Sequence, residues 1–440
     1  MKYENNWDSL NKRPVPEWFE DAKLGIFIHW GLYSVPAYAP KGNYAEWYGY
    51  HCDTPKDDDI SLQYRNYHKN TYGEDFKYAD FVSMFKAEAF DAKEWVELFR
   101  DAGAKYINLV SKHHDGFCMY KSDYAWNWNS VDVGPHRDFC KELKEACEGT
   151  DVRFGVYHSV YEWFHPLYLE NPEKYAVEHL IPMLKELIEK YQPNTLFTDG
   201  EWEHESSVWH STDFLQWLYN ESSVKDVIVP NDRWGSETRG RLGGNLTTEY
   251  GITSSFGADD DKNIDFVDRV SEECRGIGAS FGINKFETVD DYLKPQELIE
   301  LFVDLLSKGS NLLLNIGPAA DGRIPVIMEE RLRQLGKWVK LNSEAVYGSR
   351  KYCISATENV KYTKSKDGKN IYAFLHKYPF GEITLNEVDY SENITAELFG
   401  YKGKIEATNN NGKLKLNFGT VNPDDMSGEY VYVVKLRADK

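Results

Sequence analysis

Eight short apolar segments alternate with longer amphipathic segments between about residues 20 and 345. A short apolar run bounded by turn residues is typical of a buried strand, whereas apolar positions three and four residues apart are typical of a helix. Strands that alternate with helices predict a parallel sheet, and eight such units favour a TIM-like (β/α)₈ barrel. An open doubly wound sheet is less well supported, because no glycine-rich dinucleotide motif follows any of these strands. The predicted strands are 24–28, 105–110, 153–157, 194–198, 226–229, 245–248, 273–281 and 311–316.

The pattern changes near residue 349. Short alternating runs at 371–375, 382–385, 413–417 and 429–436 are separated by Asp-Gly, Asn-Asn-Gly and Pro-Asp-Asp turns. Such alternation predicts an antiparallel β-sandwich. All 13 tryptophans precede this region, and the first 349 residues hold 37 basic and 59 acidic side chains. We therefore expect an α/β barrel domain over 1–348 that carries the chemistry, and a supporting β-sandwich domain over 349–440.

Charge and composition exclude several kinds of partner. The net charge of −20 and the isoelectric point near 5.1 argue against binding nucleic acid or an anionic membrane. No apolar run approaches the ~20 residues that span a bilayer. The first 20 residues lack the features of a secretory signal, and the six cysteines show no CxxC pair. We expect reduced cysteines and a cytoplasmic location. A homo-oligomer is compatible with these features.

Asp199 is the strongest single candidate for chemistry. Active sites of (β/α)₈ barrels lie at the carboxyl ends of the strands, and Asp199 directly follows the fourth apolar run in LFTDGEW. A carboxylate beside an aromatic side chain such as Trp202 can attack the anomeric carbon of a sugar. The alternative is that Asp199 caps the helix that follows Gly200.

Four histidines also lie at predicted strand ends: His29, His113, His114 and His158. They could be metal ligands or hydrogen-bonding partners of sugar hydroxyls. A His-x-His pair at one strand end is usual for barrel metal sites. His113 and His114 are instead adjacent, and in an extended segment their side chains would point to opposite faces. This pattern favours sugar binding over metal binding, and we expect neither a metal nor another cofactor.

A segment after the first predicted strand is rich in aromatic residues. It reads Tyr44-Ala45-Glu46-Trp47-Tyr48. Aromatic faces stack on the apolar side of a sugar, and a carboxylate accepts protons from its hydroxyls. A simple aromatic cover for the barrel rim would also explain these residues.

Several separated motifs occur in a characteristic order along residues 7–348. They include HWG at 29–31, YAEWY at 44–48, HHDGF at 113–117, LFTDGEW at 196–202, NDRWG at 231–235 and RGIG at 275–278. As a set they resemble the α-L-fucosidases of glycoside hydrolase family 29.

This resemblance implies a retaining glycosidase with a catalytic barrel and a C-terminal β-sandwich. It implies that Asp199 is the nucleophile and that Glu272 is the general acid/base, although the adjacent Glu273 is an alternative. Among the residues expected to bind the sugar, the resemblance places His29, Glu46, Trp47, His113 and His114, with Tyr157 beside a further such position. To these we add His158 and Trp202 from their places after predicted strands.

The resulting prediction is an exo-acting α-L-fucosidase that works by double displacement on fucosylated oligosaccharides or glycoconjugates. Two other enzymes remain open on the residues alone. One is a metal-dependent barrel hydrolase, and the other is a retaining glycosidase for a sugar of similar stereochemistry. A non-catalytic fucose-binding relative would require loss of the carboxylates that this chain retains.

Overall fold

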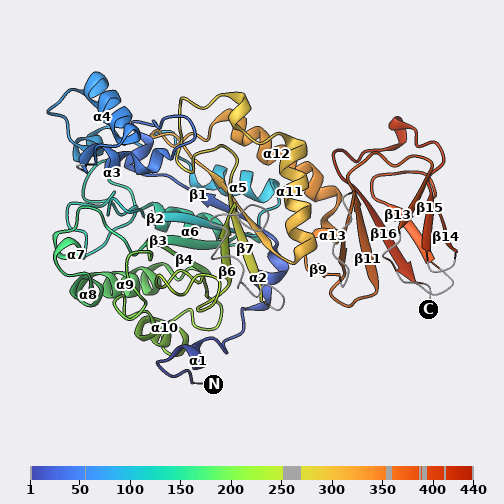
Figure 1. Cartoon of the computed structure of the whole chain (residues 1–440), viewed down its shortest axis with the longest axis horizontal. Coiled ribbons are helices and arrows are strands. Elements are labelled where there is room, and N and C mark those ends of the chain that lie inside the picture. The colour runs from blue at the N-terminus through green and yellow to red at the C-terminus, as the bar shows by residue number, and fades with distance from the viewer. Residues whose placement is uncertain are drawn as a thin grey trace.

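The computed structural model describes residues 2–54, 56–250, 269–352, 359–385, 388, 394–410 and 413–438. Eight parallel strands form one curved sheet in the order β5-β4-β3-β2-β1-β8-β7-β6 (Figure 1). The strands are β1 (Leu24–Ile28), β2 (Tyr106–Lys112), β3 (Arg153–Ser159), β4 (Thr195–Asp199), β5 (Val229–Pro230), β6 (Leu246–Glu249), β7 (Ser271–Gly276) and β8 (Asn311–Ile316). The sheet begins and ends on β5 and β6, which follow one another in the chain.

Two backbone hydrogen bonds close the ring between those two strands. The amide of Gly244 donates to the carbonyl of Asn231, and the amide of Asn245 donates to that of Pro230, both at 3.0 Å. The predicted (β/α)₈ barrel is therefore confirmed. The fifth strand is shorter than expected because its ladder with β4 covers only two residues. The seventh lies two residues earlier than expected and ends at Gly276.

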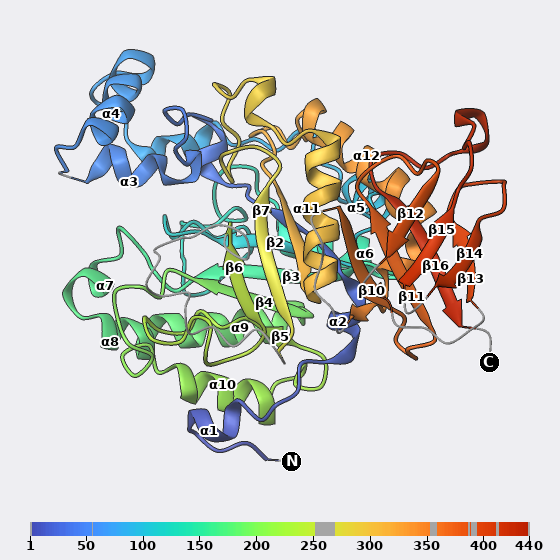
Figure 2. The same cartoon turned by 45° about the vertical axis from the view of Figure 1, so that its right-hand side comes forward.

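Helices surround the barrel on its outer face (Figure 2). The longer ones are α5 (Ala92–Asp101), α6 (Phe139–Cys147), α9 (Ile181–Tyr191), α10 (Ser211–Asn220), α11 (Pro295–Lys308) and α12 (Val326–Leu341). Shorter helices are α1 (Trp7–Leu10), α2 (Glu17–Ala22), α3 (Tyr48–Asp53), α7 (Pro166–Glu170), α8 (Pro172–Tyr175) and α13 (Ser343–Val346), while α4 (Asp59–Tyr72) projects beyond the barrel. None of the described helices has the length and apolar content needed to cross a bilayer.

Local sequence explains where these helices begin and end. The Asp91 carboxylate accepts the amides of Lys93 and Glu94, which caps the start of α5. Pro295 occupies the first turn of α11, where its missing N–H costs nothing, and Gly309 ends that helix with φ of +81°. Their apolar faces pack on the outside of the sheet.

The barrel interior is filled by side chains from neighbouring strands. Large rings from β1, β2, β3 and β4 meet inside it: Phe27, Tyr106, Tyr157 and Phe197. Phe19 of α2 joins the same cluster and covers the amino-terminal end of the strands. The barrel is thus solid at that end, so an open cavity is left only towards the carboxyl ends of the strands.

Two antiparallel sheets follow the barrel. One has the order β13-β16-β11-β10-β9 and the other β12-β15-β14. A shared apolar core that includes Tyr362, Leu385, Leu416 and Leu436 lies between them, which confirms the predicted β-sandwich. The strands are β9 (Arg350–Lys351), β10 (Val360–Lys364), β11 (Asn370–Leu375), β12 (Glu382–Leu385), β13 (Ile394–Leu398), β14 (Glu406–Asn410), β15 (Lys413–Asn417) and β16 (Tyr432–Ala438). The predicted boundary at 348/349 lies between α13 and β9.

The sandwich packs against the helices on one side of the barrel (Figures 1 and 2). The indole N–H of Trp338 in α12 donates to the carbonyl of Val431 at 2.8 Å. Arg350 forms ion pairs with Glu20 at 3.0 Å and Asp21 at 2.6 Å. Lys361 of β10 also pairs with Asp304 of α11 at 3.1 Å. Because these contacts involve α2, α11 and α12, the sandwich supports the wall and base of the barrel, and none of its side chains lines the cavity described next.

Candidate active site

A cavity of about 170 Å³ opens at the carboxyl ends of the barrel strands. Six of its thirteen lining residues are the last residue of a strand or lie within three positions after it, and the others come from strand interiors or from the loops beyond. The lining residues are Phe27, His29, Tyr44, Glu46, Trp47, His113, His114, Tyr157, Phe197, Asp199, Trp202, Glu249 and Phe281. Every substrate-binding residue predicted from sequence is in this set except His158.

Asp199 lies at the end of β4 with cationic and hydrogen-bonding groups around its carboxylate. Tyr157 donates its hydroxyl to Oδ2 at 3.0 Å, and Arg233 donates Nη1 to Oδ1 at 2.5 Å. His114 Nε2 is 3.8 Å from Oδ2. Burial by itself would raise the pKa of Asp199, but the charge of Arg233 and its other neighbours lower it to about 2. The carboxylate is therefore ionised at neutral pH and is held in one orientation.

Arg233 joins Asp199 to a second carboxylate of the cavity. Its Nη1 is 2.6 Å from Glu249 at the end of β6, and its Nε donates to Thr247 at 3.1 Å. The guanidinium also lies 4.8 Å from the centre of the Phe197 ring. Arg233 keeps its charge although it is buried, because the charges of Glu249 and Asp199 offset the cost of its desolvation.

A second guanidinium approaches Asp199 from the loop after β5. Arg239 Nη2 is 3.7 Å from Asp199 and 3.0 Å from Glu201, and Arg239 Nε donates to the same Glu201 oxygen at 3.1 Å. Burial raises the pKa of Glu201 to about 7. The two acidic residues of LFTDGEW therefore differ in the direction of their pKa shifts. The pKa of Asp199 is lowered and that of Glu201 is raised, because only Asp199 accepts a hydrogen bond from Arg233.

The histidines at the strand ends are fixed as neutral rings. His29 Nδ1 donates to Asn315 Oδ1 at 2.6 Å, and the Asn315 amide donates to the carbonyl of Phe281 at 2.7 Å, which orients the amide. His114 Nδ1 donates to the hydroxyl oxygen of Ser159, and this hydroxyl donates its own proton to the carbonyl of Tyr161. Burial lowers the pKa of His29 to about 3 and that of His114 to about 4. Each ring therefore presents Nε2 as an acceptor for a hydroxyl proton.

His113 and His114 line the same cavity, contrary to the expectation that they point to opposite faces. The ladder between β2 and β3 is irregular between Val110 and Lys112, and the histidines lie just beyond the end of β2. They are thus free of the alternation of an extended strand. The two ring centres are 4.2 Å apart, and the His113 ring is also stacked on Tyr157.

Glu46 and Trp47 form another part of the cavity wall. The Glu46 carboxylate accepts the amide of Gly282 at 2.8 Å and the hydroxyl of Ser280 at 3.3 Å. Burial raises the pKa of Glu46 to about 7 in spite of these bonds. Trp47 lies beside Trp202, with ring centres 6.1 Å apart and an interplanar angle of 29°. The cavity therefore combines hydrogen-bonding groups with aromatic faces, as carbohydrate sites do.

Comparisons with known proteins agree with this geometry. Residues 1–344 match the family model described as Alpha-L-fucosidase, and 355–437 match that of the Alpha-L-fucosidase C-terminal domain. An α-L-fucosidase of Dictyostelium discoideum is 40% identical, with 99% of this chain and 95% of that protein covered. The human tissue α-L-fucosidase is 38% identical, with coverage of 100% and 92%. The chain belongs to the α-L-fucosidase family.

Solved structures of the family share its whole architecture. The α-fucosidase of Thermotoga maritima in complex with a mechanism-based inhibitor has a TM-score of 0.83 and 31% identity, with 99% of this chain and 100% of that one covered. The same enzyme in complex with fucose has a TM-score of 0.81 and 30% identity, again with coverage of 99% and 100%. The chain is thus a glycoside hydrolase of this family over both of its domains.

Glu272, predicted as the general acid/base of this α-L-fucosidase family member, lies at the wrong end of the barrel. It is the second residue of β7, in register with Asn311 at the start of β8, and it accepts a hydrogen bond from the hydroxyl of Tyr106. The alternative, Glu273, binds Thr248 at 2.6 Å and does not line the cavity. The Glu272 prediction is wrong. The motif match identified this residue by its position in the sequence, but a catalytic acid has to lie at the carboxyl ends of the strands, where the cavity is.

His158 is the other prediction that the structure corrects. It follows Tyr157 directly in β3, so its side chain points to the opposite face of the strand. Tyr157 contacts Asp199 inside the barrel, whereas His158 is fully buried outside it, with Nδ1 3.5 Å from Ser111. His158 therefore cannot bind a ligand in the cavity.

Sequence reasoning left several residues of the site unassigned, namely Arg233, which contacts Asp199, and some of the residues that line the cavity. Arg233 and Glu249 follow predicted strands and could have been found by the same rule that identified Asp199. The apolar lining by Phe27, Phe197 and Phe281 has no such signal, because phenylalanines inside a strand pattern read as ordinary core.

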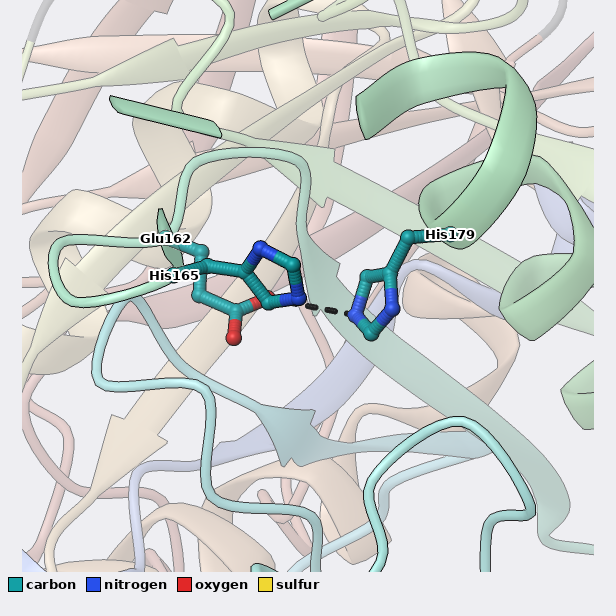
Figure 3. Close-up of side chains that lie close together, drawn as sticks. All are labelled: Glu162, His165 and His179. Atoms are coloured by element: carbon teal, nitrogen blue, oxygen red, sulfur yellow. Dashed lines mark ion pairs between the residues drawn. The ribbon is translucent and has the colours of Figure 1, made fainter. Parts of the chain in front are cut away.

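One group of histidine and carboxylate side chains among the described residues is close enough to hold a metal ion. Glu162, His165 and His179 have potential ligand atoms within 4.8 Å of one another (Figure 3). However, Glu162 Oε2 already receives Lys112 Nζ at 3.0 Å and the Tyr175 hydroxyl at 2.9 Å. His165 Nδ1 accepts the amide of Leu167, which leaves the proton on Nε2. A cation would therefore face an ammonium group and a protonated ring nitrogen.

The cluster is better described as a buried ion-pair network. Lys112 is the last residue of β2 and directly precedes His113, while Glu162 belongs to the loop that carries Tyr161 and Trp163. Lys112 holds the pKa of Glu162 well below its usual range although burial opposes this. The ion pair therefore links the two segments that surround His114.

Replacing Lys112 by Met should lower the free energy of unfolding by about 3–5 kcal/mol, because it leaves the Glu162 carboxylate buried without its cation. Urea denaturation at neutral pH measures this loss. The double variant Lys112→Met, Glu162→Gln serves as the control and should recover part of it, since no buried charge remains. A single variant within about 1 kcal/mol of wild type would contradict a buried ionic link.

Replacing Arg233 by Met should move the acidic limb of the activity profile to higher pH. Losing a cation in direct contact raises a carboxyl pKa by about one unit or more, so the ionised Asp199 that we expect the reaction to need would form only at higher pH. The pH dependence of kcat/KM on an aryl α-L-fucoside measures the shift. Arg233→Lys is the matched control, since it retains the charge and should keep the limb nearer that of wild type. An unchanged limb in both variants would be inconsistent with this role.

Proposed function

We propose that this protein hydrolyses terminal α-L-fucosides by a retaining double displacement in which Asp199 is the nucleophile. The observation that carries the proposal is the Asp199 carboxylate, ionised and held by Arg233 and Tyr157 in a cavity sized for one sugar ring. Membership of the α-L-fucosidase family over both domains supports the substrate class.

The cavity walls suit a deoxy sugar. His29, His113 and Glu46 offer acceptors for ring hydroxyls, whereas Phe27 and Phe281 form an apolar wall. The Phe27 ring is 4.5 Å from that of His29 and 6.5 Å from that of Phe281, so polar and apolar surfaces meet around one small ligand. Fucose has a methyl group where galactose has a hydroxymethyl group, and an apolar wall favours the methyl.

The same dimensions support exo action. The interior core closes the amino-terminal side of the cavity, and about 170 Å³ leaves room for a single terminal residue. The rest of the substrate must then lie outside the mouth.

The reaction proceeds in two steps. An Asp199 carboxylate oxygen forms a bond to the anomeric carbon while the bond from that carbon to the leaving oxygen breaks, and a carboxylic acid protonates the leaving oxygen. Water, deprotonated by the same group, then attacks the anomeric carbon and releases Asp199. Arg233 and Tyr157 hold the nucleophile throughout.

Two carboxyl groups among the described residues, besides Asp199, line the cavity and are placed to donate the proton. Glu46 has a pKa raised by burial to about 7, which suits an acid that works near neutral pH. Glu249 is 33% exposed and forms an ion pair with Arg233. Glu46 is favoured as the proton donor by its raised pKa, whereas Glu249 is favoured by its greater exposure.

We also propose that the protein is located in a reducing compartment such as the cytoplasm. Five cysteines of the described residues are free: Cys52, Cys118, Cys140, Cys147 and Cys274. Burial raises the pKa of the Cys118 and Cys140 thiols, so they are poor nucleophiles for disulfide exchange. Fractionation of the native cells checks the compartment.

Replacing Asp199 by Ala should reduce turnover of an aryl α-L-fucoside by at least about four orders of magnitude, because no covalent intermediate can form. Added azide should restore activity and yield β-L-fucosyl azide, since it attacks from the vacated side. Proton NMR of wild-type turnover should show α-L-fucose as the first product. Release of β-L-fucose first would disprove the retaining mechanism.

Replacing the proton donor by Gln should slow a substrate with a poor leaving group by about 10²–10⁴-fold and one with a good leaving group far less. Azide should then accelerate the variant and give α-L-fucosyl azide. Glu46→Gln and Glu249→Gln are compared directly, so each is the control for the other. If neither shows this pattern, neither Glu46 nor Glu249 is the proton donor.

A further inference from the structure

Trp202 and Trp47 line the cavity and also continue into a rim at its mouth. Trp202 is 41% exposed, so much of its surface faces solvent beyond the space for the first sugar. Tyr50 lies against Trp47 with ring centres 5.3 Å apart, and Tyr161 lies against Trp202 at 6.2 Å. The aromatic surface of the cavity thus continues from Trp47 to Tyr50 and from Trp202 to Tyr161.

Polar groups accompany these outer rings. The ammonium of Lys56 lies 5.1 Å from the centre of the Tyr50 ring and also shares a hydrogen bond with that side chain. Glu203 shares a hydrogen bond with Tyr161 and accepts another from Tyr168. Lys56 and Glu203 influence each other electrostatically, although they come from loops after β1 and β4.

We infer that Tyr50, Lys56, Tyr161 and Glu203, together with the outer face of Trp202, form a subsite for the pyranose residue to which the terminal fucose is attached. An exposed indole offers a stacking surface for a sugar face. The ammonium and the carboxylate offer a charged donor and a charged acceptor for hydroxyls of the same ring. The inference rests on the proposed fucosidase activity and specifies which part of the substrate lies outside the cavity.

The charged members make the inference testable without touching the catalytic groups. Lys56 and Glu203 are both exposed and line no part of the cavity. Lys56→Met and Glu203→Gln should therefore fold normally and leave the attack by Asp199 unaltered. Lys69→Met and Glu74→Gln are matched controls, because these residues form an equally exposed ion pair near the end of α4, with side chains 61% and 68% exposed.

The experiment compares kcat/KM on two substrates for each variant. α-L-Fucosyl fluoride has no second sugar, whereas α-L-fucosyl-(1→2)-lactose has one at the mouth. Lys56→Met and Glu203→Gln should each lower kcat/KM on the trisaccharide by about five-fold or more, as expected for a lost hydrogen bond to a charged group. Activity on the fluoride should stay within about two-fold. The α4 variants should change neither substrate.

An unchanged ratio of the two kcat/KM values in both rim variants would overturn the subsite. An equal fall on both substrates would also overturn it and would show that these side chains only tie the loops together. Failure of the proposed function looks different, because wild-type protein would then release fucose or fluoride from neither substrate. Tyr161→Phe is a further variant, which removes one hydroxyl and keeps the ring. It should lower kcat/KM on the trisaccharide and leave kcat/KM on the fluoride unchanged.

Discussion

The contact between Arg233 and Asp199 governs the chemistry of this cavity. A carboxylate buried at the end of a strand would normally take up a proton, since desolvation penalises its charge. Arg233, itself fully buried, prevents this at 2.5 Å and is neutralised in turn by Glu249. The charges in the barrel interior are therefore interdependent. Asp199 stays ionised because a cation is enclosed with it, and that cation is tolerated because two anions surround it.

The remaining groups of the cavity depend on contacts made outside it. Asn315 determines which nitrogen of His29 carries the proton, and Ser159 does the same for His114. The Lys112–Glu162 ion pair joins the end of β2 to the loop after β3, on the side of the strands away from the cavity. The barrel ladders determine the positions of the strands and strand ends that carry His29, Tyr157, Asp199 and Glu249, which keeps this part of the cavity in shape.

Much of the fold and the site could be predicted from particular residues. Asp199, His29 and Glu249 follow apolar runs, and the rule that barrel chemistry lies at carboxyl strand ends needs only that order. Glu272, which the family resemblance implied, does not satisfy this rule, because it lies at the beginning of β7. His158 failed because the period of a strand is two residues, so Tyr157 and His158 cannot face the same side. His113 and His114 escape this period because they lie just beyond the end of β2.

The sequence by itself determined the eight-fold alternation, the change to an antiparallel domain near residue 349 and the place of Asp199 at the end of the fourth strand, because these depend on local periodicity and on order along the chain. Only the tertiary structure decided the protonation of Glu46, Glu201 and Asp199. All three are buried carboxyl groups, and the pKa of each depends on which cations and amides lie within a few ångströms. Those neighbours come from distant parts of the chain: Gly282 for Glu46, and Arg233 and Arg239 for the two residues of LFTDGEW.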